Sequence, residues 1–213
     1  MRDIQHIPWC GSNYGKGIEG RRVCIVGYSH YKDNGELDTD GFTVGVLEDV
    51  IRGARRIAFF TQIKNYFAFK EHGEFWNRVL FFNYVPDCVG DFGDRYKTAS
   101  YDQISRANFR FRRIIMDERP HKVLVFTRKG WAALYPVLGE QHCLEQMPYF
   151  AWATCEAPGH TAQVFGLRHP PGASYDLMHG DGWPDSGEAA VKGFGSASKL
   201  YRIVLILTFL ASA

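Results

Sequence analysis

Four short apolar runs limit the folds open to this chain more than any other feature. They are Val23 to Val26, Val79 to Phe82, Val123 to Phe126 and Val164 to Leu167. Runs of this length, bounded by turn residues, are typical of buried strands. Strands that are apolar throughout belong to parallel sheets, whose two faces are covered by helices. The chain therefore needs helical segments between these runs.

Helical patterns do separate the runs. One spans Phe42 to Ile57, with Thr43 as a candidate cap, and a short one passes through Trp131. Another spans Ser100 to Pro120. Its expected inner face is Tyr101, Ile104, Phe109, Phe111 or Arg112, and Ile115. A last helix is expected over Ala189 to Leu210.

Strands alternating with helices indicate an α/β fold. We expect a three-layer α/β/α sandwich around a central parallel sheet of four strands. The 213 residues suggest one domain, residues 1–213, of which residues 1–20 form an irregular N-terminal arm. We also expect Tyr149 to Ala153 to form a further strand.

Composition excludes several classes of protein. Hydrophobic residues make up 46% of the chain, which is typical of a globular protein. The five cysteines, at positions 10, 24, 88, 143 and 155, form no CxxC pair, which argues against a disulfide framework and against a zinc or iron–sulfur site. We expect reduced thiols in the cytoplasm, no metal and no cofactor. The acidic residues between Lys32 and Gly41 are interpreted as a solvated loop.

The net charge of +2 does not by itself indicate a nucleic-acid-binding protein. Aromatic residues reach 15% and serve either as core or as surfaces on which bases stack. The helix from Phe42 to Ile57 carries Arg52, Arg55 and Arg56 away from its apolar side. These arginines form either a solvated face or contacts to phosphates. The apolar run from Ile203 to Ala213 is too short to span a membrane, and the N-terminus is polar, so we expect no membrane association.

Polar groups follow three of the four apolar runs. The first run leads into Gly27-Tyr28-Ser29-His30-Tyr31, the second into Asn83, and the last into Arg168-His169-Pro170-Pro171-Gly172. Ligands bind at strand ends of this kind in open α/β sheets. The three motifs therefore predict one site.

In their order and spacing these motifs resemble those of the uracil-DNA glycosylase superfamily, over roughly residues 20 to 180. Gly27 to Tyr31 is similar to the family's first motif, GQDPYH in its best-known branch, and is closer to a divergent branch that has GESHY. Asn83 matches a base-reading asparagine. His169-Pro170-Pro171 resembles the HPS motif.

The resemblance implies roles for these residues. Asn83 would pair with the imide edge of uracil through its amide donor and acceptor, and His169 would donate to the base O2. Gly27 and Tyr28 would line the substrate site, with Tyr28 in place of the family's glutamine or glutamate, and Tyr31 would wall it against a thymine methyl. Each also has a structural interpretation: Asn83 and His169 as turn residues, and Tyr31 as a core aromatic.

Ser29 stands where the best-known branch has the aspartate that positions the attacking water. A serine supplies no negative charge to the developing cation. Three replacements are open: His30 orients the water, Asp33 reaches in from the loop, or catalysis rests on Asn83 and His169.

The resemblance also implies contacts to DNA and to the base. Arg168, Pro170, Pro171, Gly172 and Ser174 would contact the DNA backbone, and Leu177 or Met178 would enter the base stack. An aromatic in the zone Asn65 to Asn77 would stack on the extruded base; the candidates are Tyr66, Phe67, Phe69, Phe75 and Trp76.

The expected function is hydrolysis of the N-glycosidic bond of uracil, or of a modified or deaminated base, in single- or double-stranded DNA by a monomeric protein. A base must leave the stack before such chemistry. Two alternatives stay open: a module on the same fold that binds nucleic acid or nucleotide without cleavage, which Ser29 favours, and a hydrolase of small nucleosides or nucleotides.

Overall fold

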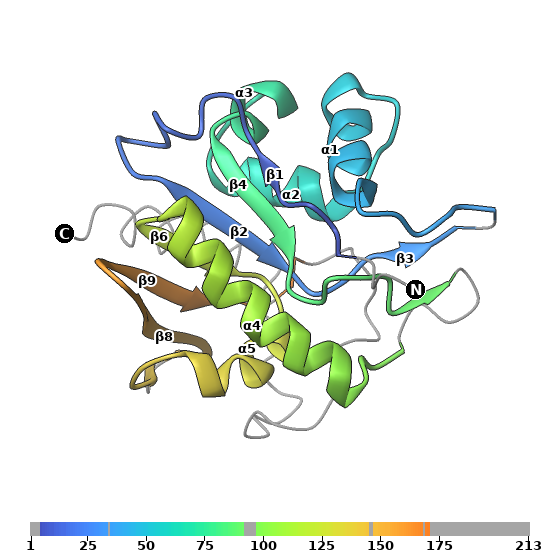
Figure 1. The fold of residues 1–213 in the computed structure, drawn as a ribbon. Coiled ribbons are helices and arrows are strands. Elements are labelled where there is room, and N and C mark those ends of the chain that lie inside the picture. The colour runs from blue at the N-terminus through green and yellow to red at the C-terminus, as the bar shows by residue number, and fades with distance from the viewer. Residues whose placement is uncertain (1–4, 34, 92–96, 145–146, 168, 171–213) are drawn as a thin grey trace, which may run out of the picture.

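The computed structural model describes residues 5–33, 35–91, 97–144, 147–167 and 169–170. A mixed sheet of seven strands lies at the centre, in the order β1-β4-β2-β6-β9-β8-β7 (Figure 1). The strands are β1 (Trp9–Cys10), β2 (Val23–Gly27), β4 (Val79–Asn83), β6 (Lys122–Val125), β7 (His142–Leu144), β8 (Met147–Ala157) and β9 (His160–Gly166).

The four expected strands are the parallel centre of this sheet. β4, β2, β6 and β9 are neighbours and run in the same direction. In register, Gly27 pairs with Asn83, and Val125 pairs with Gly166. The carboxyl ends of these strands therefore share one edge of the sheet.

The sheet is larger than the four strands expected. β1 adds to β4 and β8 adds to β9, both antiparallel. Sequence reasoning placed β1 in an irregular arm because two residues carry no periodic pattern. It placed part of β8 and a turn over Glu156 to His160, but not the antiparallel pairing that joins β8 to β9 through Gly159, whose φ is 68°.

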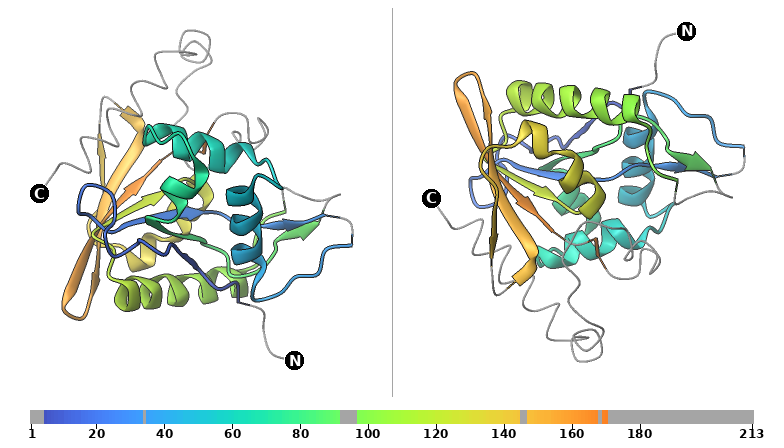
Figure 2. Two further views of the ribbon diagram at one scale, coloured as in Figure 1. Left: turned by 90° about the horizontal axis from the view of Figure 1, so that it is seen from above. Right: turned by 90° about the horizontal axis from the view of Figure 1, so that it is seen from below.

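Helices pack on both faces of the sheet because strand side chains alternate between the faces. α1 (Phe42–Arg52), α2 (Ala58–Tyr66) and α3 (His72–Trp76) pack with Ile25 and Phe81. α4 (Tyr101–Glu118), α5 (Arg128–Ala133) and the short 3-10 helix η1 (Tyr135–Val137) lie with Val26 and Phe82. Figure 2 shows α2 and α3 in teal and α4 in light green on opposite sides of the sheet.

The helix boundaries follow local signals in part. α4 begins at Ser100, whose side chain accepts from the Gln103 backbone in a capping box. α1 has Gly41 as its N-cap, so Thr43 is not the cap that was expected. Tyr101 and Phe109 were assigned to the inner face of α4 but are 87% and 73% exposed.

A second, two-stranded sheet lies outside the main one. β3 (Tyr31–Lys32) pairs in parallel with β5 (Gly90–Asp91). Figure 1 shows this pair beyond the carboxyl end of β2. Within the described part of the chain, no helix is both long and apolar enough to cross a membrane. The helix expected over Ala189 to Leu210 lies outside the described residues.

Candidate functional site at the carboxyl ends of the parallel strands

Gly27 and Asn83 end two neighbouring parallel strands and lie side by side. A Cβ atom added to Gly27 would lie 2.2 Å from Asn83 Oδ1 and 3.5 Å from Phe59 Cζ. No side chain fits in that space. The glycine is therefore what lets the Asn83 amide lie against the end of β2.

Two aromatic rings lie at the same place. Phe59, in the first turn of α2, is 8% exposed. Its ring centroid lies 5.1 Å from that of His169, with 35° between the planes. We call Gly27, Phe59, Asn83 and His169 the strand-end site.

Asn83 is buried, and its side-chain amide has no hydrogen-bond partner among the described residues. Its amide atoms keep some contact with solvent, since they are not among the fully buried atoms that lack a partner. An amide offers one acceptor and two donors. The Asn83 side chain is therefore a polar group at this edge that can bind a ligand.

The protonation of His169 differs from the expectation. Its Nδ1 lies 3.2 Å from the Pro170 carbonyl oxygen. A carbonyl only accepts, so Nδ1 carries the proton and Nε2 of the neutral ring is an acceptor. Burial lowers the pKa of His169, which favours this neutral form. In this tautomer Nε2 cannot donate to a base oxygen, as the resemblance implied, but it can accept from a water.

His30 contacts the start of α1 instead of the strand-end site. Its Nε2 lies 3.0 Å from Thr43 Oγ1, and its ring packs against Phe42 and His6. Burial, followed by the charges of His6 and Arg55, lowers the pKa of His30 to about 3. Its neighbour Ser29 is partly buried. The described contacts give His30 no part in orienting a water at the strand-end site.

The two tyrosines of the first motif lie apart. The Tyr28 hydroxyl accepts from the Ala99 backbone at 3.3 Å, and Lys129 Nζ lies 5.9 Å from the ring centroid. Tyr31 belongs to β3 and is 39% exposed. The described contacts therefore give no support to Tyr31 as a wall of the base site.

The acidic loop is engaged and is not simply solvated. Arg55 donates to Asp33 Oδ2 at 2.9 Å and to Glu36 Oε1 at 3.0 Å. Asp38 bonds His6 at 2.6 Å. Asp33 thus has a partner away from the strand-end site. The same pairs show that Arg55, at least, does not form a free basic face.

Arg110, on α4, is 7% exposed. Its Nη1 donates to the Asn83 carbonyl at 2.8 Å, and its Nη2 donates to the His6 carbonyl. Burial lowers its pKa to about 10, so the guanidinium is charged at neutral pH. It fixes the backbone of Asn83 from behind and places a buried positive charge there.

The aromatics expected to stack on a base lie mostly in the core. Tyr66, Phe67, Phe75 and Trp76 are all buried in the core beneath α1 to α3. Phe59 is the aromatic that reaches the strand-end site. The sequence signal that could have indicated Phe59 is its position at the start of α2, the helix that follows α1.

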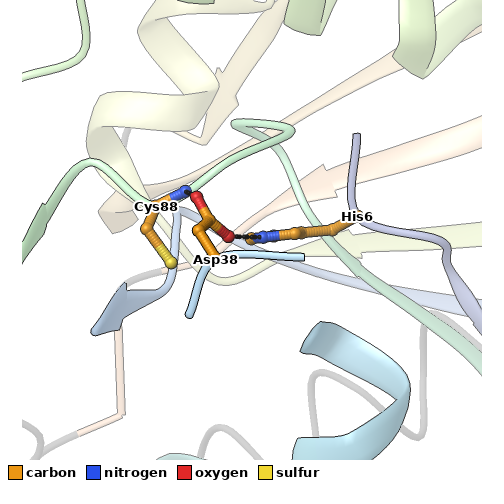
Figure 3. Close-up of side chains that lie close together, drawn as sticks. All are labelled: His6, Asp38 and Cys88. Atoms are coloured by element: carbon orange, nitrogen blue, oxygen red, sulfur yellow. Dashed lines mark hydrogen bonds and ion pairs between the residues drawn. The ribbon is translucent and has the colours of Figure 1, made fainter. Parts of the chain in front are cut away.

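A separate group brings together His6, Asp38 and Cys88, which we call the His6 cluster (Figure 3). Sequence reasoning missed it because the three residues share no motif spacing.

Of the expected DNA-binding residues, Pro170 is buried beside His169. Arg168, Pro171, Gly172, Ser174, Leu177 and Met178 lie outside the described residues.

No protein-family model matches the chain, and no curated protein matches it. What the molecule does must therefore be argued from the site itself.

Proposed function

We propose that this protein is a DNA glycosylase that excises uracil or a related base, on the three-layer α/β/α fold of the uracil-DNA glycosylase superfamily. The observation that carries the proposal is the Asn83 amide, which lies unpartnered against Gly27 at the site where the Phe59 and His169 rings meet. An aromatic face together with a donor–acceptor amide matches a planar base that has an imide edge.

Recognition would use both groups at once. Phe59 would stack on an extruded base, an interaction worth about 1–3 kcal/mol per base. The Asn83 Nδ2 would donate to a base oxygen, and its Oδ1 would accept from the imide N–H. Gly27 leaves the space that this pairing requires.

The chemistry would rest on stabilising the leaving base. When the glycosidic bond breaks, its electron pair goes to the base and the sugar becomes cationic. The Asn83 donor and the Arg110 charge behind it would stabilise the developing anion. A water held by the unprotonated Nε2 of His169 would add to the sugar carbon and transfer a proton to Nε2. The leaving base would take a proton from solvent.

DNA contacts are proposed around the same edge. Lys129, in the first turn of α5 and beside Tyr28, would contact phosphate, together with Arg168 and the residues Pro170 to Ser174. Cys10, Cys24, Cys88 and Cys155 are free thiols, which is compatible with the cytoplasmic location expected.

A second candidate is a module that binds a base without cleaving it. Ser29 carries no charge, and the nearby Asp33 and Asp38 are bonded to Arg55 and His6. Among the described residues of the motif loops, we find no carboxylate placed to assist a water at the strand-end site.

The experiment is an excision assay on oligonucleotides that carry uracil, hypoxanthine, xanthine or 5-hydroxymethyluracil, followed by alkali. Wild type is compared with Asn83→Ala and His169→Ala. Asn77→Ala is the matched control because Asn77 precedes the opposite end of the same strand. Cleavage at one base, lost in both variants and kept in the control, supports the glycosylase. If wild type cuts nothing but binds uracil-containing DNA through Asn83, the protein is a binding module.

A further inference from the structure

The His6 cluster joins three segments that are far apart in the sequence. His6 lies in the N-terminal arm, Asp38 in the loop before α1, and Cys88 between β4 and β5. One ligand atom from each lies within 4.8 Å of the other two. His6 Nε2 is 2.6 Å from Asp38 Oδ1, and the Cys88 backbone N–H donates to Asp38 Oδ2 at 2.9 Å (Figure 3).

The cluster is not arranged as a cysteine nucleophile. A nucleophilic thiol needs a lowered pKa and a base beside it. Burial, and then Asp38, raise the pKa of the Cys88 thiol. The His6 imidazole is directed at Asp38. The imidazole is therefore not placed to activate the thiol.

The donor set is instead that of a transition metal. Imidazole nitrogen, carboxylate oxygen and thiolate sulfur are zinc ligands, whereas calcium and magnesium prefer oxygen alone. With the thiol deprotonated, Asp38 and Cys88 carry two negative charges, which equal the charge of one Zn²⁺. The side chain of His6 is 1% exposed and that of Asp38 is 14% exposed, so the site is partly shielded and still open to a small ligand on the side of Asp38.

His6 has a further incomplete feature. Its Nδ1 is buried and has no hydrogen-bond partner in the described structure. The hydrogen bond to Asp38 therefore leaves one ring nitrogen unsatisfied. A metal at Nε2 would leave Nδ1 in the same state, so the case for a metal rests on the three ligand atoms and their distances.

We propose that the His6 cluster binds one Zn²⁺ through His6 Nε2, Asp38 and Cys88 Sγ, with water as the fourth ligand. The ring proton moves from Nε2 to Nδ1, and the thiol releases one proton to solvent. With bonds of about 2.0 Å, His6 Nε2 and Asp38 Oδ1 separate to about 3.3 Å. Because Nδ1–H would have no described acceptor, the affinity is about 10–100-fold below that of a site with this second contact.

The ion would fasten together the loops beside the strand-end site. The His6 and Asn83 carbonyls share the Arg110 guanidinium, so the cluster is joined to that site through one side chain. The zinc proposal does not depend on the proposed excision activity.

The test is titration of the metal-free full-length chain with Co²⁺, and then displacement of the cobalt by Zn²⁺. One equivalent should bind and give the near-ultraviolet thiolate-to-cobalt charge-transfer band. Cys88→Ser should abolish the band, and Asp38→Asn should weaken binding at least tenfold. Cys10→Ser is the matched control, because Cys10 is exposed and lies near Glu118, and it should behave as wild type.

Alkylation provides a second readout that does not depend on variants folding. Zn²⁺ should protect Cys88 of the wild-type protein, mapped by peptide mass, and leave the Cys10 rate unchanged. The proposal is overturned if the wild type binds no cobalt, if the band survives in Cys88→Ser, or if zinc leaves the Cys88 alkylation rate unchanged.

Discussion

The two ends of the parallel strands carry similar polar residues but use them differently. At the amino end, the Arg22 backbone N–H donates to His121 Nδ1 at 3.0 Å, and Lys122 Nζ donates to Gln163 Oε1. Most polar groups named at the amino end bond one another, although Arg22 Nε is buried without a partner. At the carboxyl end, no described hydrogen bond involves the Asn83 side chain.

The backbone supports this difference. At the carboxyl end a glycine is required at position 27 so that the Asn83 side chain can lie flat against the strand. Arg110 then holds Asn83 from behind through its carbonyl oxygen. The carboxyl end is fixed in position but is not saturated with hydrogen bonds, as expected of a preorganised binding site.

Gly27→Ala should have the largest effect on the proposed excision activity. The new Cβ would occupy the place of Asn83 Oδ1, so the amide must move by about 1 Å or more. Misplacement of this size costs about 100-fold in rate. Single-turnover excision measures it. Gly45→Ala, in open space on α1, should keep full activity; equal losses in both variants would contradict the steric argument.

If the proposed excision occurs, Arg110→Met should lower its rate about ten- to hundredfold, because a hydrogen bond to a charged group is worth about 1.5–3 kcal/mol. The fall should be in kcat rather than KM, since in the proposed mechanism the buried charge would act on the leaving base. Arg113→Met, which removes an exposed arginine from the same helix, is the control. An unchanged kcat in a folded Arg110→Met protein would show that Arg110 does not contribute to the excision rate.

His30 should make stability depend on pH. Its pKa is about 3 in the folded protein and near 6.5 when unfolded, so the unfolded state binds the extra proton. Below pH about 6.5 the free energy of unfolding should therefore fall, by up to about 1.4 kcal/mol per pH unit from this group.

Urea titrations between pH 7 and pH 4 measure that slope. His30→Gln should flatten it, whereas replacing His160, for which the structure gives no comparable contact with the motif loops, should not. A slope unchanged in His30→Gln would mean that His30 is charged in the folded protein, or that other groups carry the dependence.

Tyr31→Ala should have the smallest effect. The side chain lies in the small outer sheet, so base selectivity between uracil and thymine should be unchanged, and stability should shift by no more than about 0.5 kcal/mol. Competition assays with the two bases measure the selectivity. Excision of thymine by the variant would show that Tyr31 does form a wall of the base site.

Sequence reasoning located the four parallel strands because a fully buried strand leaves a clear apolar run. It missed β1, β7 and the outer part of β8, which have mixed composition. The start of α4 was predictable because the Ser100–Gln103 capping box is local.

The site could be predicted only where a residue ends a strand. Gly27, Asn83 and His169 were named for that reason. Phe59, Arg110 and the partners of His30 were not, since they depend on contacts between distant segments. Arg110 in particular is one of four arginines on the same helix, and only packing distinguishes it.

The most direct test of the central claim is NMR of the ¹⁵N-labelled protein titrated with uracil. We predict that the side-chain amide of Asn83 and the backbone N–H of Gly27 shift together and saturably, while Arg22 and His121 do not move. No shift at Asn83, or shifts confined to the amino end of the strands, would contradict the claim that the carboxyl end is built to bind a base.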